Sequence, residues 1–144
     1  MDKVRNPIEI AAAGTVLTGT LALASATPTK LGSMRDAFVW VDYTRNVGSA
    51  TGRPMLAVEI SRDSPDTAAG SVSHWTRVTI GDGSLFSSGA VELYYEELDF
   101  PTGSTATYHW PDISVAGAWW LRAYVADKDG ANPGTCAVYL TGGV

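Results

Sequence analysis

Apolar residues recur at every second position in short runs along most of this chain of 144 residues. A period of two places successive side chains on opposite faces of an extended strand, whereas an amphipathic helix needs apolar residues three and four positions apart. The runs are bounded by Gly, Pro, Asn and Ser, which are typical of turns. The chain is therefore expected to fold almost entirely into β-strands.

The runs predict about eight strands at intervals of roughly ten residues, without helices that could connect parallel strands. This pattern predicts an all-β fold, an antiparallel β-sandwich or jelly roll, in which the last two strands form a terminal hairpin. The predicted strands cover residues 15–24, 37–44, 54–62, 72–80, 90–100, 105–110, 119–126 and 135–141. Their shared alternation predicts a core of Leu56, Val58, Ile60, Leu121, Ala123, Val125, Cys136, Val138 and Leu140.

The length of the chain fits one domain, which we place at residues 14–144. Residues 1–13 are expected to form an N-terminal arm, because Pro7 interrupts regular structure and the charged residues around it cannot build a core. The apolar stretch 11–26 resembles a secretory signal, but Glu9 and several Gly and Thr residues argue against this interpretation. No run approaches the ~20 apolar residues of a membrane span, so no membrane association is expected.

The charge balance limits the possible partners. The formal net charge is −5, and no basic run offsets the repulsion of phosphate groups, so nucleic acid is not expected as a ligand. Only 17% of the residues are charged, which is low for a protein surrounded by water on all sides. Part of the surface is therefore expected to be covered by a partner.

The sequence contains no pattern typical of catalysis, and we predict no catalytic, metal-binding or cofactor-binding residues. His74 and His109 lie within predicted strands and lack a nucleophile signature, and together with Cys136 they do not give a zinc-binding spacing. The acidic cluster at 92–99 is interpreted as a solvated or interface face. The sequence Asp-Lys-Asp-Gly at 127–130 resembles the start of a calcium loop but lacks the later ligands, so we interpret it as a turn.

Aromatic residues are the most informative candidates for binding, because they provide a large contact area at low entropic cost. The strand at 37–44 carries bulky side chains on both faces, and one face presents Phe38 and Trp40. The strand at 119–126 places Trp120, Arg122 and Tyr124 on one face, a composition found in protein-binding hot spots, in sugar-stacking platforms and in ordinary sheet packing. In the arm, Ile8 and Ile10 could add a strand to a neighbouring subunit. The predicted partner-binding residues are Ile8, Ile10, Phe38, Trp40, Trp120, Arg122 and Tyr124.

Five segments resemble small β-sandwich virion proteins of tailed bacteriophages: 38–44 (FVWVDYT), 56–63 (LAVEISRD), Trp75, 118–124 (AWWLRAY) and 134–139 (GTCAVY). The resemblance lies in the succession of short aromatic-rich strands, the acidic balance and the closing pair of strands. It extends over most of the predicted sandwich and contains no motif from which a functional residue can be transferred.

The resemblance implies a structural, non-enzymatic virion protein, with capsid decoration as the expected role. Its partners would be the major capsid protein or other virion subunits, its location the virion, and its own oligomer a trimer. A carbohydrate-binding or receptor-binding module of a tail or fibre is the alternative, using the same aromatic residues to stack on sugar rings. An enzyme is a third alternative, which the lack of a triad or metal pattern disfavours.

Overall fold

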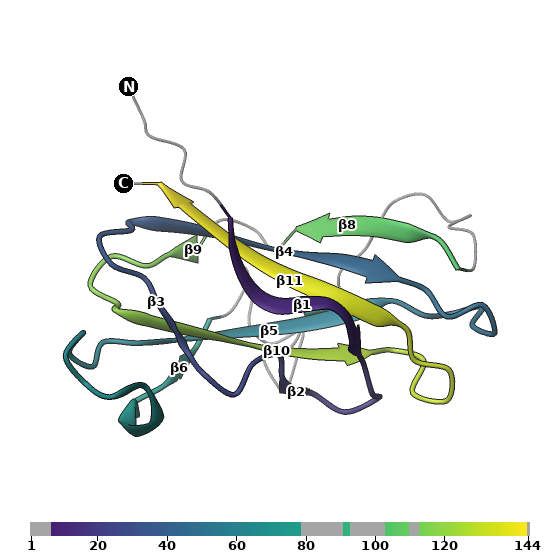
Figure 1. Cartoon of the computed structure of the whole chain (residues 1–144), viewed down its shortest axis with the longest axis horizontal. Helices are drawn as coiled ribbons and strands as arrows, with labels where there is room; N and C mark the ends of the chain where they lie inside the picture. Colours follow the sequence, from purple (N-terminus) through teal and green to yellow (C-terminus); the bar gives the residue numbers. More distant parts are fainter. Residues whose placement is uncertain (1–6, 79–90, 93–102, 110–112, 144) are drawn as a thin grey trace.

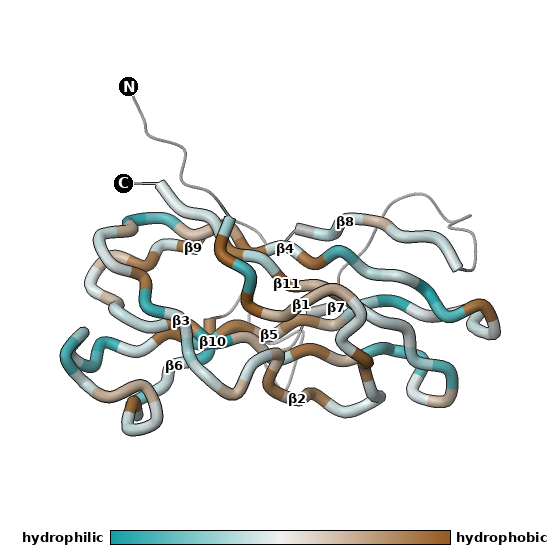
Figure 2. Tube along the Cα trace, in the orientation of Figure 1, coloured by the Kyte–Doolittle hydropathy of each residue, from teal (hydrophilic) through white to brown (hydrophobic). Residues whose placement is uncertain are grey.

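A computed structural model describes residues 7–78, 91–92, 103–109 and 113–143 of the chain. Its strands form two sheets whose neighbouring strands are antiparallel and whose inner faces pack together, as Figure 1 shows. The predicted all-β antiparallel sandwich is therefore confirmed. Hydrophobic residues run along the strands between the sheets, and many hydrophilic residues lie in the loops at the ends (Figure 2).

The first sheet, sheet A, has the strand order β1-β11-β4-β8, and β9 also pairs with β4. The long strands β4 and β11 pair over nine residues from Thr44–Thr135 to Asp36–Gly143 and form the centre of the sheet. Sheet A consists of β1 (Ile8–Val16), β4 (Asp36–Thr44), β8 (Thr105–His109), β9 (Ile113–Ser114) and β11 (Thr135–Gly143).

The second sheet, sheet B, has the order β2-β10-β5-β6, with β3 beside β10 and β7 beside β5. Four of its strands have only two residues, which is too short for an alternating pattern to reveal them. The described residues form eleven strands where the sequence predicts about eight, and the two-residue strands β3 and β9 are among those that no predicted run contains. Sheet B consists of β2 (Ala22–Leu23), β3 (Thr29–Lys30), β5 (Pro54–Ser61), β6 (Thr76–Arg77), β7 (Val91–Glu92) and β10 (Trp120–Asp127).

The core predicted from alternation is confirmed, with one difference. All the predicted core residues are buried except Ile60, which lies at the end of β5 and is partly buried against the core. Sheet A adds Val39, Val41 and Tyr43, which point inward from β4 and have no exposed surface. Each large aliphatic side chain that is fully buried contributes about 1.5–3 kcal/mol through the hydrophobic effect.

The prediction of an arm over residues 1–13 is wrong for residues 8–13, which belong to β1. This strand pairs with β11 of the same chain, from Ile8–Leu140 to Val16–Thr135. Ile10 is 7% exposed and packs in the core, so the chain uses this strand for its own sandwich. Residues 1–6 lie outside the described residues.

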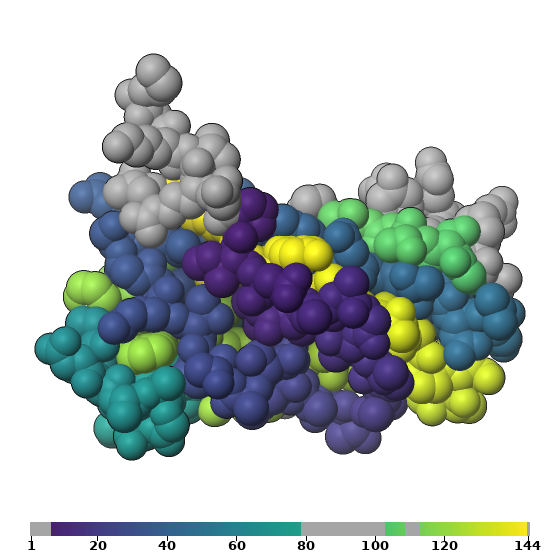
Figure 3. All heavy atoms as spheres, in the orientation of Figure 1, coloured from purple at the N-terminus to yellow at the C-terminus, as the bar shows by residue number. Residues whose placement is uncertain are grey.

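The predicted strand at 15–24 is also wrong, because the chain leaves sheet A after Val16 and joins sheet B only at Ala22. In the space-filling view, β1 and the segment that follows it lie over the near side of the molecule (Figure 3). Leu17, at the crossing, is 2% exposed and closes this side of the core. The apparent alternation of 15–24 therefore belongs to a chain that changes sheets.

The predicted terminal hairpin is wrong in the same way. The strands β10 and β11 are consecutive, but β10 pairs with β5 in sheet B and β11 pairs with β4 in sheet A. The turn-rich segment 128–134 therefore carries the chain from one sheet to the other. Two other predicted strands are reduced: residues 72–75 belong to a loop before β6, and of the run at 90–100 only β7 is described.

Candidate functional site

The outer face of sheet B carries a row of stacked aromatic and guanidinium groups. The guanidinium carbon of Arg122 lies 4.2 Å from the ring centre of Trp75 and 5.4 Å from that of Tyr124. The guanidinium of Arg77 lies 5.0 Å from the same Tyr124 ring centre. Both arginines donate an Nε hydrogen bond to the carboxylate of Glu59, at 2.7 Å from Arg122 and 3.2 Å from Arg77. We call these five residues the sheet B stack.

The charged groups of the sheet B stack are paired with one another. Burial raises the pKa of Glu59, but the hydrogen bonds and positive charges of Arg122 and Arg77 outweigh burial and hold that pKa below its usual value. The side chain of Glu59 is 12% exposed and those of the two arginines 25–28%. Each charged group of the stack already has a partner within the chain. The arrangement of Arg122 and Tyr124 on the outer face of sheet B is therefore explained by packing within the sheet.

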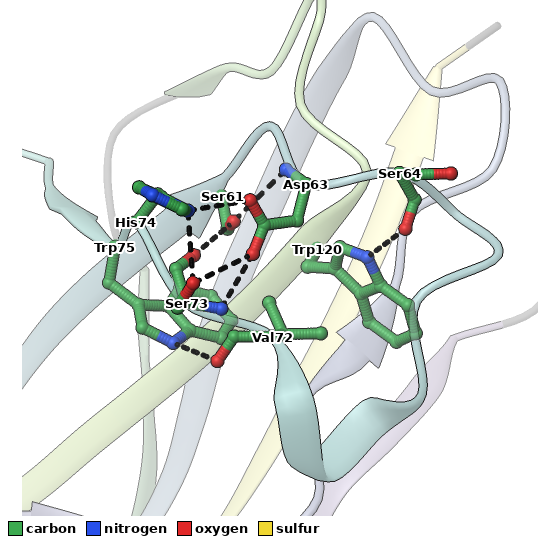
Figure 4. Close-up of polar contacts among 8 residues, drawn as sticks. All are labelled: Ser61, Asp63, Ser64, Val72, Ser73, His74, Trp75 and Trp120. Atoms are coloured by element: carbon green, nitrogen blue, oxygen red, sulfur yellow. Dashed lines mark hydrogen bonds and ion pairs between the residues drawn. The ribbon is translucent and has the colours of Figure 1, made fainter.

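A loop of residues 62–75 covers the end of sheet B beside Trp120, as Figure 4 shows. The indole Nε1 of Trp120 donates to the carbonyl oxygen of Ser64 at 3.1 Å, and the residue is only 5% exposed. Asp63 accepts hydrogen bonds from the backbone N–H of Ser73 at 2.6 Å and from its hydroxyl at 3.3 Å, while its other oxygen lies 2.9 Å from Nδ1 of His74. These bonds close the loop on itself.

Asp63, His74 and Ser73 are the residue types of a hydrolase triad, but their geometry differs from that of a proton relay. In a relay the carboxylate binds one imidazole nitrogen and the nucleophile binds the other. Here Asp63 Oδ1 and Ser73 Oγ both lie 2.9 Å from the same atom, Nδ1 of His74. The His74 side chain is 83% exposed and its backbone has a φ of 55°, in the left-handed region. The three residues therefore form a loop closure.

A buried polar network connects the two sheets at the opposite end of the sandwich. Asp127, which has no exposed surface, accepts a hydrogen bond from the hydroxyl of Tyr43 at 2.7 Å. The same carboxylate accepts from the backbone N–H groups of Gly134 at 2.7 Å and Asp129 at 2.8 Å. The side chain of Asp129 accepts from the Ser49 hydroxyl, so the carboxylates of 127 and 129 order the connection between β10 and β11.

The predicted interpretation of 127–130 as a turn agrees with these bonds, since both carboxylates accept from groups of the protein. Among the described residues, no three His, Cys, Asp or Glu side chains gather as metal ligands would. Cys136 is buried, as predicted, and burial followed by the negative charge of Asp127 raises the pKa of its thiol to about 12.

The outer face of sheet A presents three aromatic side chains, which we call the sheet A aromatic face: Phe38, Trp40 and Tyr139. Trp40 and Tyr139 are cross-strand neighbours on β4 and β11, and their rings stack with centres 5.5 Å apart and planes 29° apart. Phe38 lies two residues before Trp40 on β4 and is 39% exposed. The small residues Gly143 and Thr141 lie beside this end of β4, so no large neighbour on β11 covers Phe38.

A hollow of about 230 Å³ lies on the same outer face, next to the stacked rings. Its lining includes Ala137 and Thr135 of β11, Tyr139, and Asp42 of β4. The hydroxyl of Thr107 on β8 donates to Asp42 Oδ1 at 2.7 Å. On the β1 side the wall is formed by Ala13 and Gly14, where the pairing with β11 shifts register and Gly14 takes a φ of 86°.

The structure separates the predicted partner-binding residues into two groups. Ile10 and Trp120 are buried, Ile8 is half-buried against the core, and Arg122 and Tyr124 belong to the self-satisfied stack. The prediction that these five residues bind a partner is corrected, because their side chains are largely buried or engaged in contacts within the chain. Phe38 and Trp40 remain available. The side chain of His109 and the acidic cluster at 93–99 lie outside the described residues.

Two residues of the candidate site were missed by the sequence analysis. The alternation of β11 with Cys136, Val138 and Leu140 facing inward already implies that Tyr139 faces outward. Similarly, Asp42 shares the outward phase of Trp40 on β4. What the alternation could not show is that β4 and β11 are neighbours, which brings the two aromatic rings together.

Comparison with known proteins gives no relative for this chain: no family model, no curated protein and no solved structure matches it. The described part of the chain contains no helix with the length and apolar content required to span a membrane. The candidate site is thus defined by its geometry alone.

Proposed function

We propose that this chain is a non-enzymatic structural protein of a bacteriophage virion, a capsid decoration protein that contacts the shell through the sheet A aromatic face. The observation that carries the proposal is the outward position of Phe38, Trp40 and Tyr139 together on one sheet. Phe38 on this face is 39% exposed, whereas loop 62–75 closes over one end of sheet B. The resemblance of the aromatic-rich strands to phage virion proteins supplies the kind of partner.

The physical basis of the proposal is the energetics of protein contacts. Binding energy in protein interfaces is concentrated in a few aromatic and arginine residues near the centre of the contact, surrounded by residues that exclude water. Trp40 and Tyr139 are already ordered by their mutual stacking, so little side-chain entropy is lost when a partner covers them. A rigid sheet that presents preordered rings is suited to attachment to a repeated surface.

The test is binding to shells of the major capsid protein encoded together with this chain, measured by co-sedimentation. Replacing Phe38 and Trp40 by alanine should weaken binding by about tenfold or more, as for hot-spot residues. Trp119 is the matched control, because it is 38% exposed, against 39% for Phe38, but lies directly before β10 of sheet B. Equal binding by the double variant and the Trp119→Ala variant would contradict the proposal.

A sugar-binding module of a tail or fibre is the second candidate, and one observation favours it. Stacked rings beside a carboxylate and a hydroxyl, as at Trp40, Asp42 and Thr107, resemble the combination of platform and hydrogen-bonding groups used for sugars. A glycan array separates the two candidates: specific glycan binding that is lost in Trp40→Ala, without binding to shells, would favour this second function.

We also propose that the chain associates into trimers on the shell, as the resemblance implies. Light scattering of the purified protein should give three times the mass of one chain. A mass that stays at one chain at high concentration would contradict the trimer.

A further inference from the structure

We infer that the hollow beside the sheet A aromatic face receives a cationic side chain, an arginine or lysine, from an extended segment of a partner protein. The inference rests on the proposed function, since it specifies the chemistry of the partner at the same surface. It is argued from the charges of the two sheets, from a comparison with the sheet B stack, and from the size of the hollow.

The strands of the two sheets differ in charge. Among the described side chains of the sheet A strands there are three carboxylates, Glu9, Asp36 and Asp42, and no lysine or arginine. The described side chains of the sheet B strands include three cations, Lys30, Arg77 and Arg122, and two carboxylates, Glu59 on the outer face and the buried Asp127. A partner that covers sheet A therefore gains from positive charge, which guides association and specificity.

The sheet B stack shows how this protein arranges a complete set of such groups. There, the guanidinium of Arg122 lies over the Trp75 ring at 4.2 Å and is held by the Glu59 carboxylate at 2.7 Å. On sheet A, the carboxylate of Asp42 and the aromatic pair Trp40–Tyr139 occupy one face in the same way. No ion pair to Asp42 occurs within the described part of the chain. The carboxylate and the rings are present, and the cation is the missing group.

The hollow places these groups where an incoming side chain can reach them. Asp42 and Tyr139 both line it, together with Ala137, which lies opposite Asp42 on β11, and Thr135. The hydrogen bond from Thr107 to Oδ1 of Asp42 orients the carboxylate without neutralising its charge. A cation within about 6 Å of an aromatic ring centre is attracted to the ring face, and this adds to its pairing with the carboxylate.

The size of the hollow indicates a side chain and not a whole small-molecule ligand. Pockets for such ligands have volumes of about 300–1,000 Å³, and this hollow has about 230 Å³. Phe38 lies further along β4 in the same outward phase as Asp42, so a partner in the hollow can also contact the exposed ring. An extended segment matches this arrangement, because its alternate side chains point to the same face.

The test uses a capped six-residue peptide of alternating arginine and threonine, titrated into the full chain and followed by NMR. We expect saturable shifts of the amide signals of Asp42, Thr107 and Ala137 and of the Trp40 indole signal. The same peptide with citrulline in place of arginine keeps the shape but removes the charge. It should bind at least about fivefold more weakly, and salt should weaken the binding of the arginine peptide.

The variant Asp42→Asn keeps an oxygen that can accept from Thr107, so it removes the charge with little change in packing. It should bind the arginine peptide at least about fivefold more weakly than the wild type. Asp66→Asn is the matched control, because it makes the same change in net charge at an exposed residue of the loop 62–75. Equal affinities of the two variants, or shifts centred on sheet B, would overturn the inference.

The remaining outcomes separate this inference from the proposed function. If the wild type sediments with shells through the sheet A aromatic face but Asp42→Asn binds the peptide and the shells normally, the cationic contact is wrong and the proposed function stands. If the peptide binds as expected but no shell binding occurs, the decoration role is wrong and the cation site stands. If Asp42→Asn dissociates an oligomer of the chain itself, the occupant is a second copy and the assignment to a partner protein is overturned.

Discussion

The substitution Asp127→Ala is expected to destabilise the sandwich strongly, because one carboxylate joins the two sheets and the connection between β10 and β11. In the folded chain this carboxylate accepts hydrogen bonds from the Tyr43 hydroxyl and the Gly134 N–H, both buried, and from the Asp129 N–H at the edge of the network. Alanine leaves the two buried donors without their acceptor.

The expected magnitude follows from these bonds. Each buried donor that loses its acceptor costs about 1–3 kcal/mol. Part of this cost is offset because the variant no longer has to remove a charged carboxylate from water. We therefore expect a net loss of about 3 kcal/mol in the free energy of unfolding, a large part of the about 5–15 kcal/mol typical of a domain.

The assay is urea unfolding followed by tryptophan fluorescence, with Asp66→Ala as a control at an exposed aspartate that should stay within about 0.5 kcal/mol of the wild type. A double-mutant cycle with Tyr43→Phe should show a coupling free energy of about 1–2 kcal/mol, since both substitutions remove the same hydrogen bond. Refutation would be an Asp127→Ala variant within about 1 kcal/mol of the wild type, or a coupling near zero.

Four further outcomes are expected. Deleting residues 1–13 removes most of β1 and buried Ile10, so it should lower the free energy of unfolding by about 2 kcal/mol or more in urea titrations; an unchanged midpoint would restore the arm as a separate segment. Val58→Asp should cost at least about 4 kcal/mol and yield insoluble protein in expression tests, because it buries an unpaired charge. Burial raises the pKa of the Cys136 thiol to about 12, so the neutral thiol stabilises the folded state below its ordinary pKa of 9.0, and this stability is lost as the pH rises toward 12. Cys136→Ala should therefore flatten the decline of the melting temperature at alkaline pH. In the wild type, a thiol reagent should react with Cys136 only when urea unfolds the protein. The pKa of Asp63 lies below its ordinary value, chiefly because of the backbone hydrogen bond from Ser73. The ionised carboxylate therefore stabilises the folded state at neutral pH, and this stability is lost as the pH falls through the lowered pKa. The melting temperature of Asp63→Asn should fall less between about pH 5 and pH 2 than that of the wild type.

The aromatic residues on the two outer faces of this sandwich have different surroundings. On sheet B, Trp75 and Tyr124 are packed with arginines that both form ion pairs with Glu59, and Trp120 is hydrogen-bonded to Ser64 in the covering loop. On sheet A the rings are exposed to different degrees beside carboxylates. The composition of a strand face, such as tryptophan, arginine and tyrosine on alternate positions, is therefore insufficient to identify a binding site.

The alternation of apolar residues determined the all-β class and the inward faces of the long strands. Val58, Leu121 and Val138 could be assigned to the core from sequence because the face of a strand residue depends only on its position along its own strand. Alternation likewise placed Phe38 and Trp40 together on one face of β4, opposite Val39, Val41 and Tyr43. These are local properties, set by the pleat of an extended chain.

Tertiary structure decided which strands are neighbours and where the chain changes sheets. Residues 17–21 and the connection 128–134 cross between the sheets, and no local pattern separates such a crossing from a strand or a hairpin turn. The same applies to the candidate site: Tyr139 and Trp40 are 99 positions apart in the chain, and only the register of β11 against β4 stacks their rings. Pairing depends on long-range packing and on buried bonds such as that from Tyr43 to Asp127, whereas alternation depends on backbone geometry alone.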